Sequence, residues 1–511
     1  MDVSHIIDSL NDAQREAVTA QNDHLLVLAG AGSGKTRVLV HRMAWLMSVD
    51  RVPPTSILAV TFTNKAAKEM RYRVEQMMQI PTRGLWIGTF HGIAHRLLRS
   101  HWKDAGLPEN FQVLDSDDQL RLIKRVMREN RIDESQWPPK QAQWFINSQK
   151  DEGLRADHIQ ENPGDHFTNT MLKIYRQYEK LCQQGGLVDF GELLLRSHEL
   201  WLHRPELLSH YQQRFQHILV DEFQDTNTIQ YAWLQVLASN RVPLTVVGDD
   251  DQSIYGWRGA KIENIQQYQR DFPNSRLVRL EQNYRSTKTI LKAANSVIAN
   301  NQGRLGKELW TDGVEGEPIS LYAAFNEQDE ANYIADSISA WVSEGNLRSE
   351  CAILYRSNAQ SRVLEEALMR QGIPYRVYGG LRFYDRQEIR NALAYLRLVH
   401  YHRDDAAFER VVNIPTRGIG AKSLQEIREY ATGQGISLWE SSERLLAAGQ
   451  VKGRAKTGLQ QFMEIINTLS EMAGHASLQG LMKQAIESSG LKDYHASEKG
   501  EKGQARVENL E

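Results

Sequence analysis

The stretch Leu25–Thr36 reads Leu-Leu-Val-Leu-Ala-Gly-Ala-Gly-Ser-Gly-Lys-Thr, an apolar run that passes directly into a glycine-rich loop. Such a loop, of the type G-x-x-x-x-G-K-[ST], needs glycines so that backbone N–H groups can close around phosphate oxygens. The sequence predicts a strand, this loop, and a helix whose N-terminal dipole faces the phosphates. A glycine-rich turn without a ligand also fits a bare match, but the flanking strand and helix patterns favour binding of a nucleoside triphosphate.

Composition sets broad limits on the class of protein. The 511 residues suggest roughly three or four domains. With 41% hydrophobic and 24% charged residues and a net charge of −3, the chain is typical of a globular protein. A local basic stripe for nucleic acid is still compatible with that balance. Cys182 and Cys351 show neither metal-ligand spacing nor a disulfide framework, which fits a reducing cytosol. We find no signal peptide, and no apolar run approaches the ~20 residues of a membrane helix.

Apolar runs that alternate with helical stretches predict a parallel sheet in the first part of the chain. The middle, residues 90–215, reads instead as long amphipathic helices, such as Gln119–Glu129 and Met171–Cys182. We therefore expect a helical subdomain inserted into one α/β domain. The strands expected in that domain are Leu25–Leu28, Ile57–Thr61, Leu85–Gly88, Gln216–Val220 and Pro243–Gly248.

A second α/β pattern is expected from about Leu280. Its candidate strands are Ile319–Ala323 and Cys351–Tyr355, and a helix at Ala359–Gln371 leads to the run Tyr375–Tyr378. From about Gly379 onward the pattern is helical.

Two acids follow the apolar strand that ends at Val220, in the sequence Asp221-Glu222-Phe223-Gln224-Asp225. Sites in open α/β sheets lie at the carboxyl ends of strands. Asp221 is suited to hold Mg²⁺, together with Thr36, and Glu222 to orient and deprotonate an attacking water. Lys35 is expected to reach the β- and γ-phosphates. A solvated acidic turn is the alternative reading of the pair.

The next strand ends in a run from Gly248 to Gly259 that combines acids, Gln252 and aromatics. The amide of Gln252 is suited to sense the γ-phosphate. Tyr255 and Trp257 are candidates for stacking on bases, since they lie among glycines after a sheet edge. Taken alone, they fit core packing equally well.

Three further motifs follow predicted strands or a domain junction. In Gln282-Asn283-Tyr284-Arg285-Ser286, Arg285 is a candidate finger on the γ-phosphate, and Tyr284 is a candidate to stack on adenine. The segment Thr61–Ala67, which contains Phe62, Thr63 and Asn64, suits a nucleic-acid phosphate. His91 lies in Gly88–Gly92, where nothing in the spacing indicates metal binding.

The order of these motifs resembles that of the UvrD/Rep-type superfamily 1 helicases, and in particular their bacterial helicase II branch, along essentially all 511 residues. The resemblance implies two RecA-like P-loop domains with parallel sheets flanked by helices, each with a helical insertion. It places the first RecA-like domain at 1–89 plus 216–281 and its insertion at 90–215. The first half of the second RecA-like domain falls at 282–378, and a truncated helical insertion of that domain at 379–511.

The resemblance also implies an ATP-dependent 3′–5′ DNA helicase that acts in excision and mismatch repair in the bacterial cytoplasm, associated with the nucleoid. Its cofactors would be ATP and Mg²⁺. Its partners would be single-stranded DNA, single-strand/duplex junctions and DNA repair proteins, with no membrane.

Residue roles follow from the same resemblance. Lys35, Glu222, Gln252 and Arg285 are the catalytic candidates, and Thr36 with Asp221 would hold Mg²⁺. The ATP contacts would be Gln14 on the base, Ala29, Gly30, Ala31, Gly32, Ser33, Gly34, Lys35, Thr36, Arg37 beside the base, Tyr284 and Arg285. The DNA contacts would be Phe62, Thr63, Asn64, His91, Tyr255, Trp257, Arg258, Arg356, Asn358, Thr416, Gly418 and Gly420.

One departure from the family is apparent. Motifs of the types T-x-H-x-x-K-G-L-E and T-R-A-R, expected near the end of the second motor domain, are not found before Glu511. The sequence thus predicts an incomplete second RecA-like domain. The alternative function is a DNA-binding ATPase remnant that cannot unwind DNA. A P-loop kinase is a third class, but it would need neither the loop aromatics nor two α/β halves.

Overall fold

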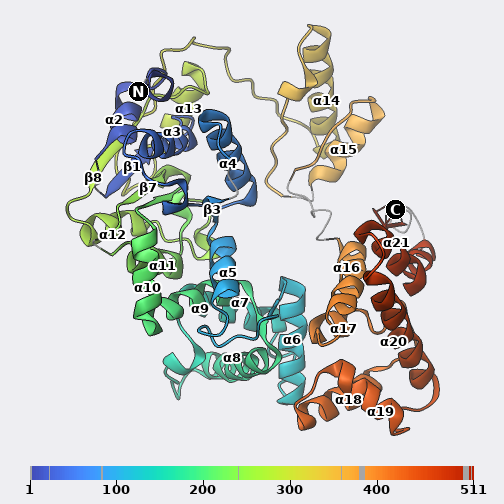
Figure 1. Cartoon of the computed structure of the whole chain (residues 1–511). Coiled ribbons are helices and arrows are strands. Elements are labelled where there is room, and N and C mark those ends of the chain that lie inside the picture. The colour runs from blue at the N-terminus through green and yellow to red at the C-terminus, as the bar shows by residue number, and fades with distance from the viewer. Residues whose placement is uncertain are drawn as a thin grey trace. The chain divides into compact units, whose positions relative to one another are not determined.

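A six-stranded parallel sheet lies at the centre of the first part of the molecule (Figure 1). The strand order is β3-β2-β6-β7-β1-β8, so β1 lies between β7 and β8. The strands are β1 (Leu25–Ala29), β2 (Ile57–Thr61), β3 (Trp86–Thr89), β6 (His217–Val220), β7 (Leu244–Gly248) and β8 (Arg276–Leu280). The five strands predicted for the first α/β domain are confirmed and differ only at their ends. We did not predict β8, which occupies an edge of the sheet beside β1.

The computed structural model describes residues 3–21, 24–81, 84–239, 241–357, 360–378, 386–498, 506–507 and 509–510. The chain divides into two compact units, Met1–Pro318 and Ile319–Glu511. The boundary between the two motor domains that is expected from the sequence, at 281/282, is a different division from that between these compact units and stays a prediction. Residues 282–318 belong to the first unit because they hydrogen-bond to its loops, as described below.

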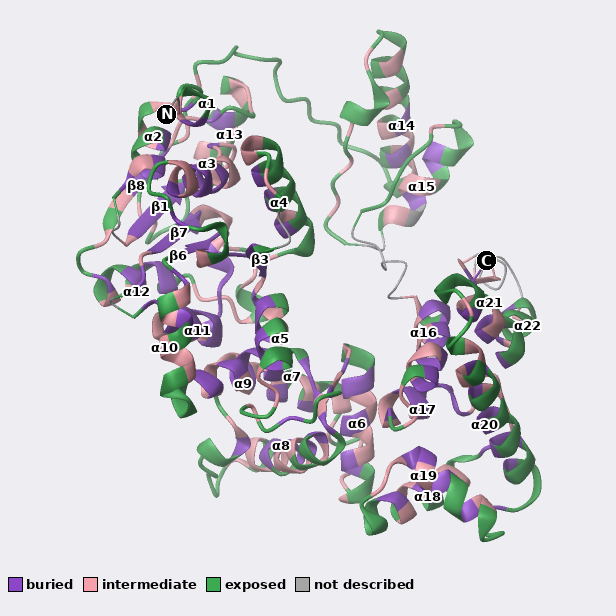
Figure 2. Ribbon diagram, viewed as in Figure 1, coloured by how far each residue is buried: buried purple, intermediate pink, exposed green. Residues whose placement is uncertain are grey.

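Both faces of the sheet are covered, which explains why its strands read as nearly continuous apolar runs. Leu26 and Leu28 of β1 face one hydrophobic cluster, whereas Leu25 and Val27 face the other. Figure 2 shows β1, β6 and β7 as buried. The helices associated with this sheet are α1 (Ser4–Ile7), α2 (Asp12–Thr19), α3 (Lys35–Ser48), α4 (Asn64–Met78), α11 (Thr228–Ala238), α12 (Glu263–Asp271) and α13 (Lys288–Ile298).

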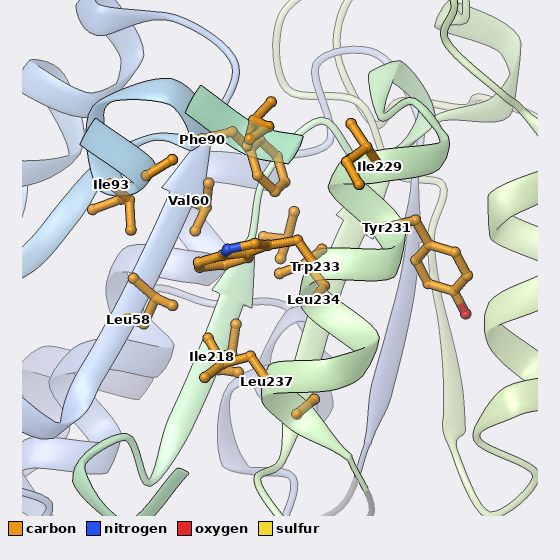
Figure 3. Close-up of a cluster of buried hydrophobic side chains, with 14 of the residues drawn as sticks. Leu58, Val60, Phe90, Ile93, Ile218, Ile229, Tyr231, Trp233, Leu234 and Leu237 are labelled. Atoms are coloured by element: carbon orange, nitrogen blue, oxygen red, sulfur yellow. The ribbon is translucent and has the colours of Figure 1, made fainter. Parts of the chain in front are cut away.

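The helical segment predicted at 90–215 is joined to one face of this sheet through a shared core. Trp233 of α11 is 1% exposed and points toward Leu58 and Ile218 of the sheet (Figure 3). Phe90 and Ile93 of α5 reach the same cluster. The segment contains α5 (Phe90–Ser100), α6 (Ser116–Glu129), α7 (Pro139–Asp151), α8 (His166–Gly185), α9 (Phe190–His203) and α10 (Pro205–Arg214), with a short parallel pair of strands, β4 (Gln112–Val113) and β5 (Leu187–Val188).

The second unit is helical in its described residues, and the strands predicted there are not formed. Ile319–Ala323 and Cys351–Tyr355 are extended without pairing, and Leu321 and Leu354 are 96% and 94% exposed. An apolar run becomes a strand only when a neighbouring strand satisfies its backbone groups, and the described residues of this unit provide none. The prediction of a second parallel sheet is therefore wrong for this structure.

Helices of the second unit pack around two hydrophobic clusters. The smaller cluster joins α14 (Glu327–Ser343) and α15 (Ser361–Arg370), and α15 matches the helix predicted at 359–371. The larger one confirms the helical pattern predicted after residue 379. It is formed by α16 (Gln387–His400), α17 (Asp405–Val411), α18 (Ala421–Gln434), α19 (Leu438–Ala447), α20 (Gly453–Ala473), α21 (Leu478–Ser489) and α22 (Leu491–Ala496).

Candidate nucleotide site and nucleic-acid groove

The glycine-rich loop connects the end of β1 to the start of α3, as the sequence predicted. Gly32 and Gly34 have φ values of 68° and 91°, in the left-handed region that glycine adopts without strain. The Ser33 hydroxyl donates to the Gly30 carbonyl at 2.7 Å and braces the turn. A Cβ at Gly32 would lie 2.5 Å from Asn283 Nδ2, so only glycine fits this position. Ala29 is the last residue of β1, and Ala31 lies in the loop, where its carbonyl accepts a hydrogen bond from Asn283.

Lys35 and Glu222 face each other at the mouth of this loop. Lys35 Nζ lies 3.2 Å from Glu222 Oε2, and the two side chains are 11% and 33% exposed. Within the described residues, Lys35 Nζ is buried but makes no hydrogen bond. A buried ammonium whose carboxylate partner lies outside hydrogen-bond geometry still has hydrogens to donate, which suits an anionic ligand. Glu222 has a φ of 51°, a conformation uncommon for residues other than glycine and frequent at functional sites.

Asp221 lies at the end of β6, buried beside Thr36. Burial, which is the largest cause, and the neighbouring Glu222 carboxylate together raise the pKa of Asp221 to about 7, although Lys35 and hydrogen bonds with the Glu222 backbone and with Thr36 oppose the shift. A buried carboxylate paired with a hydroxyl is the type of oxygen donor set that Mg²⁺ accepts. These residues therefore fit a magnesium ion, which would restore the ionised form of the carboxyl group.

Gln224, which the sequence analysis did not single out, links the acids to the end of β7. Its Nε2 donates to Glu222 Oε2 at 2.8 Å, and its Oε1 accepts from the Asp249 backbone N–H at 2.9 Å. Gln252 Nε2 in turn donates to the Asp249 carboxylate. A continuous path of polar contacts thus joins Lys35 to Gln252. Only its two ends and Glu222 were identified from sequence.

The motif at 282–286 lies directly against the loop. Asn283 Nδ2 donates to the Ala31 carbonyl at 2.6 Å, and the Tyr284 N–H donates to the Gly32 carbonyl at 3.0 Å. Asn283 Oδ1 accepts from the backbone of Arg285 and Ser286, which shapes the turn that carries Arg285. Arg285 itself is exposed. Asn283 is a residue whose importance the sequence did not reveal, because its role depends on a contact across 252 positions.

Three of the predicted base contacts lie near the start of α3. Gln14 is buried, and its Nε2 donates to the Ser33 carbonyl at 2.8 Å. Arg37 donates to the Ser9 carbonyl at 2.8 Å. The Tyr284 hydroxyl accepts from Asn11 Nδ2 at 2.8 Å, and the residue is 54% exposed. The structure thus brings all three predicted base contacts to one side of the loop.

A groove of about 780 Å³ lies between the sheet and the helical segment, and several of the predicted DNA contacts line it. The Phe62 and Tyr255 rings are stacked with centroids 5.3 Å apart. Trp257 is 70% exposed, and the Arg258 guanidinium lies 4.6 Å from its ring centroid. The exposure of Trp257 decides against the alternative that it is a core residue. Trp144 and Phe190 also line this groove, and neither was among the DNA contacts predicted from the sequence.

The remaining predicted DNA contacts of the first unit lie at the N-terminal ends of two helices. Thr63 caps α4 by accepting from the Ala66 N–H at 3.1 Å, and Asn64 is the exposed first residue of that helix. His91 follows β3, and its ring lies edge-on to Phe190 at 5.7 Å. Burial lowers the pKa of His91 to about 4, so the ring is neutral at physiological pH.

Predicted DNA contacts in the second unit occupy two exposed turns. Arg356 is exposed, and its N–H donates to Gln360 Oε1 at 3.1 Å, whereas Asn358 lies outside the described residues. Thr416, Gly418 and Gly420 are exposed on one turn. Arg417 anchors that turn by donating to the Tyr395 hydroxyl at 2.6 Å and to the Ser489 carbonyl at 3.0 Å.

Across the described residues, no helix combines the length and apolar character required to cross a bilayer. Residues 10–273 match the UvrD/REP helicase N-terminal domain, and residues 278–496 match the UvrD-like helicase C-terminal domain.

Curated relatives extend this match. The chain is 60% identical over 511 residues to DNA helicase II of Escherichia coli (strain K12), covering 100% of this chain and 71% of that protein. It is 42% identical over 509 residues to ATP-dependent DNA helicase PcrA of Bacillus subtilis (strain 168), covering 99% of this chain and 69% of that one.

These matches bear on two expectations. Because the C-terminal-domain family covers 278–496, the prediction that the second motor domain is incomplete is not supported. The alternative of a remnant unable to unwind DNA is accordingly not favoured, and a P-loop kinase is excluded. The resemblance read from the order of the motifs is confirmed, and the chain belongs to the UvrD/Rep family of DNA helicases.

Proposed function

We propose that this helicase hydrolyses ATP at the loop after β1 and uses the energy to move along single-stranded DNA in the 3′–5′ direction. The observation that carries the proposal is the polar path from Lys35 through Glu222, Gln224 and Asp249 to Gln252. Tyr255 and Trp257 follow in the same loop and line the groove. The path gives a physical route from the nucleotide to the nucleic acid.

The hydrolytic roles follow from charge and position. Lys35 neutralises the β- and γ-phosphates, and the backbone N–H groups of Gly32 and of Gly34–Thr36 hold the remaining phosphate oxygens. Thr36 and Asp221 hold Mg²⁺, which supplies electrostatic stabilisation of the phosphate chain when bound. Glu222 accepts a proton from the attacking water. Gln224 holds the Glu222 carboxylate in position for this transfer.

The base and the γ-phosphate are assigned to residues around the loop. Tyr284 stacks on adenine with its exposed ring, and Gln14 and Arg37 lie beside the base. Arg285 and Gln252 sense the γ-phosphate, so each changes its interactions when the phosphate leaves.

The nucleic-acid side uses aromatic stacking and cations. Phe62, Tyr255 and Trp257 present rings to bases, since stacking accepts every base, and Arg258 adds a charge for the backbone. Thr63, Asn64 and His91 contact the strand from helix starts. Arg356, Asn358, Thr416, Gly418 and Gly420 are proposed as further DNA contacts of the second unit.

In domain terms, we assign residues 1–89 with 216–281 to the first motor domain and residues 90–215 to its insertion. We assign residues 282–378 to the second motor domain and residues 379–511 to its insertion. The cellular setting we propose is excision and mismatch repair in the bacterial cytoplasm, at single-strand/duplex junctions on the nucleoid and together with repair proteins.

A strand-displacement assay tests direction and chemistry together. Duplexes with either a 3′ or a 5′ single-stranded tail are incubated with ATP and Mg²⁺, with wild-type protein or with Glu222→Gln. We expect only the 3′-tailed duplex to be unwound, and only by the wild type. Unwinding of the 5′-tailed duplex alone would contradict the proposed direction, and unwinding by Glu222→Gln at the wild-type rate would contradict the role of Glu222.

A further inference from the structure

The segment that follows α13 crosses the end of β7 and touches the glycine-rich loop. Gln282 pairs with Trp310 in an isolated parallel bridge, which ties the segment to the 282–286 motif. Leu309 is so close to the loop that a Cβ added at Gly30 would lie 2.1 Å from Leu309 Cδ2. A nucleotide-dependent movement of the glycine-rich loop or of the 282–286 motif would therefore displace residues 304–310.

Lys307, in this segment, reaches three consecutive aspartates. Its Nζ lies 2.7 Å from Asp249 Oδ1 and 2.9 Å from Asp251 Oδ2, and it also contacts the Asp250 carboxylate. The side chain of Lys307 is 3% exposed, and those of Asp249 and Asp250 are 2% and 4% exposed. Two buried carboxylates with a third, partly buried one beside them repel one another strongly unless a cation lies among them.

Arg304 adds a second positive charge to that of the Lys307 ammonium, at the more exposed carboxylate of the cluster. Its guanidinium binds the Asp251 carboxylate with two contacts of 2.7 Å, and its Nη2 also donates to the Lys307 carbonyl at 2.9 Å. The Leu305 N–H donates to Asp250 Oδ2 at 2.9 Å. Oxygens of the three carboxylates lie within 4.8 Å of one another, a spacing that also suits a metal ion. The Lys307 ammonium already occupies this position, which leaves these acids no role as metal ligands.

The cluster is connected to the nucleotide site through Asp249. One oxygen of this carboxylate accepts from Lys307 and the other from Gln252 Nε2. The Asp249 backbone N–H donates to Gln224, which in turn holds Glu222. The orientation of the Gln252 amide thus depends on a carboxylate whose position Lys307 sets.

We propose that Lys307 is a positioning residue for ATP hydrolysis, which acts by fixing Asp249 and, through it, Gln252 and Gln224. This inference rests on the proposed function of the site. Lys307 does not contact the nucleotide position itself. Its removal leaves uncompensated buried carboxylates, so the turn at 249–252 loses its geometry while the phosphate-binding loop persists. The loss then falls on the chemical step more than on ATP binding.

Steady-state ATP hydrolysis of the full chain with single-stranded DNA tests this inference. For Lys307→Met we expect kcat to fall by about tenfold or more, with the KM for ATP changed by less than about threefold. Arg304→Gln removes the cation on one carboxylate only, so its kcat should fall by about two- to fivefold. Lys292→Met, which removes an exposed lysine from the nearby α13, should match the wild type.

A charge-compensating variant separates positioning from general damage to the fold. In Lys307→Met combined with Asp250→Asn, one carboxylate is neutralised, and we expect part of the lost kcat to return. A Lys307→Met protein with wild-type kcat, or a change confined to KM, would overturn the inference. If Lys307→Met does not fold, as judged by circular dichroism, Arg304→Gln decides: a lowered kcat supports the inference and a wild-type kcat overturns it.

Failure of the proposed function would have a different signature. In that case the wild type would hydrolyse no ATP, or Lys35→Ala would hydrolyse it as fast as the wild type. With an active wild type and an inactive Lys35→Ala, the kcat of the Lys307 and Arg304 variants reports on the positioning role alone.

Discussion

The nucleotide side and the groove side of the first unit are built in opposite ways, although a single loop joins them. On the nucleotide side, charged groups such as Asp221 and Lys35 are removed from solvent and held by neighbours of fixed geometry. On the groove side, Trp257 is 70% exposed. Electrostatic interactions are strong in a desolvated site, whereas an exposed ring contributes only the energy of one stacking contact. Chemistry is thus concentrated in a few residues, and strand binding is distributed over many.

The largest effect is expected at the Lys35–Glu222 pair. Glu222→Gln keeps the shape of the side chain but removes the proton acceptor, so kcat for ATP hydrolysis should fall by roughly 10²–10⁴-fold. Lys35→Ala should abolish measurable hydrolysis because the cation on the phosphates is lost. A phosphate-release assay measures both, with the exposed Lys292→Ala as the control. ATP hydrolysis at the wild-type rate in either variant would contradict the proposed role of the Lys35–Glu222 pair in the active site.

The shape of the loop should matter next. Gly32→Ala places a Cβ 2.5 Å from Asn283 Nδ2 at a φ of 68°, so the loop or the Asn283 contact must shift. A left-handed non-glycine residue costs about 1–2 kcal/mol, which predicts roughly five- to thirtyfold weaker ATP binding. Isothermal titration calorimetry checks this value. Gly433→Ala is the matched control, since nothing lies within 4 Å of its added Cβ. Equal affinities of the two variants would show that the loop tolerates the distortion.

An effect of similar size, but on DNA binding instead of ATP binding, is expected on the groove side. Trp257→Ala should weaken single-strand binding by about 1–3 kcal/mol if one base stacks on the ring. Ile254→Ala is a close control because Ile254 is also 70% exposed in the same loop but carries no ring. Fluorescence anisotropy with a labelled oligothymidylate at fixed salt compares the two. Identical DNA affinities of the two variants would show that no base stacks on Trp257.

The smallest effect is expected from the Phe62–Tyr255 stack. A double-mutant cycle with Phe62→Ala and Tyr255→Ala, read out as DNA affinity, should give a coupling of about 0.5–1.5 kcal/mol for a stacked pair. Additive effects would mean that the two rings contact DNA independently. In that case the contrast between an interconnected nucleotide side and a distributed groove side becomes sharper.

The sequence predicted the first sheet well because its interior strands are buried on both faces and therefore read as apolar runs. β8 escaped prediction because Arg276 and Arg279 interrupt its pattern at the sheet edge. The runs Ile319–Ala323 and Cys351–Tyr355 show the converse. Their local pattern is that of strands, yet pairing depends on neighbours that local pattern does not specify.

The same distinction applies to the site. Lys35, Asp221 and Glu222 were identified because their motifs are short and local. Gln224, Asn283 and Lys307 were passed over because their significance comes from contacts with residues distant in sequence or with a backbone group. No spacing rule connects Lys307 to Asp250, 57 positions away, before the fold is known.

The coupling between the two sides is tested most directly by the ATP hydrolysis rate with and without single-stranded DNA. The wild type should hydrolyse ATP many times faster when oligothymidylate is present. Trp257→Ala should need a higher DNA concentration to reach the same rate, and Glu222→Gln should remain inactive with or without DNA. A wild-type rate that is unaffected by DNA would contradict the account, because the polar path from Lys35 to Gln252 would then not connect hydrolysis to the groove.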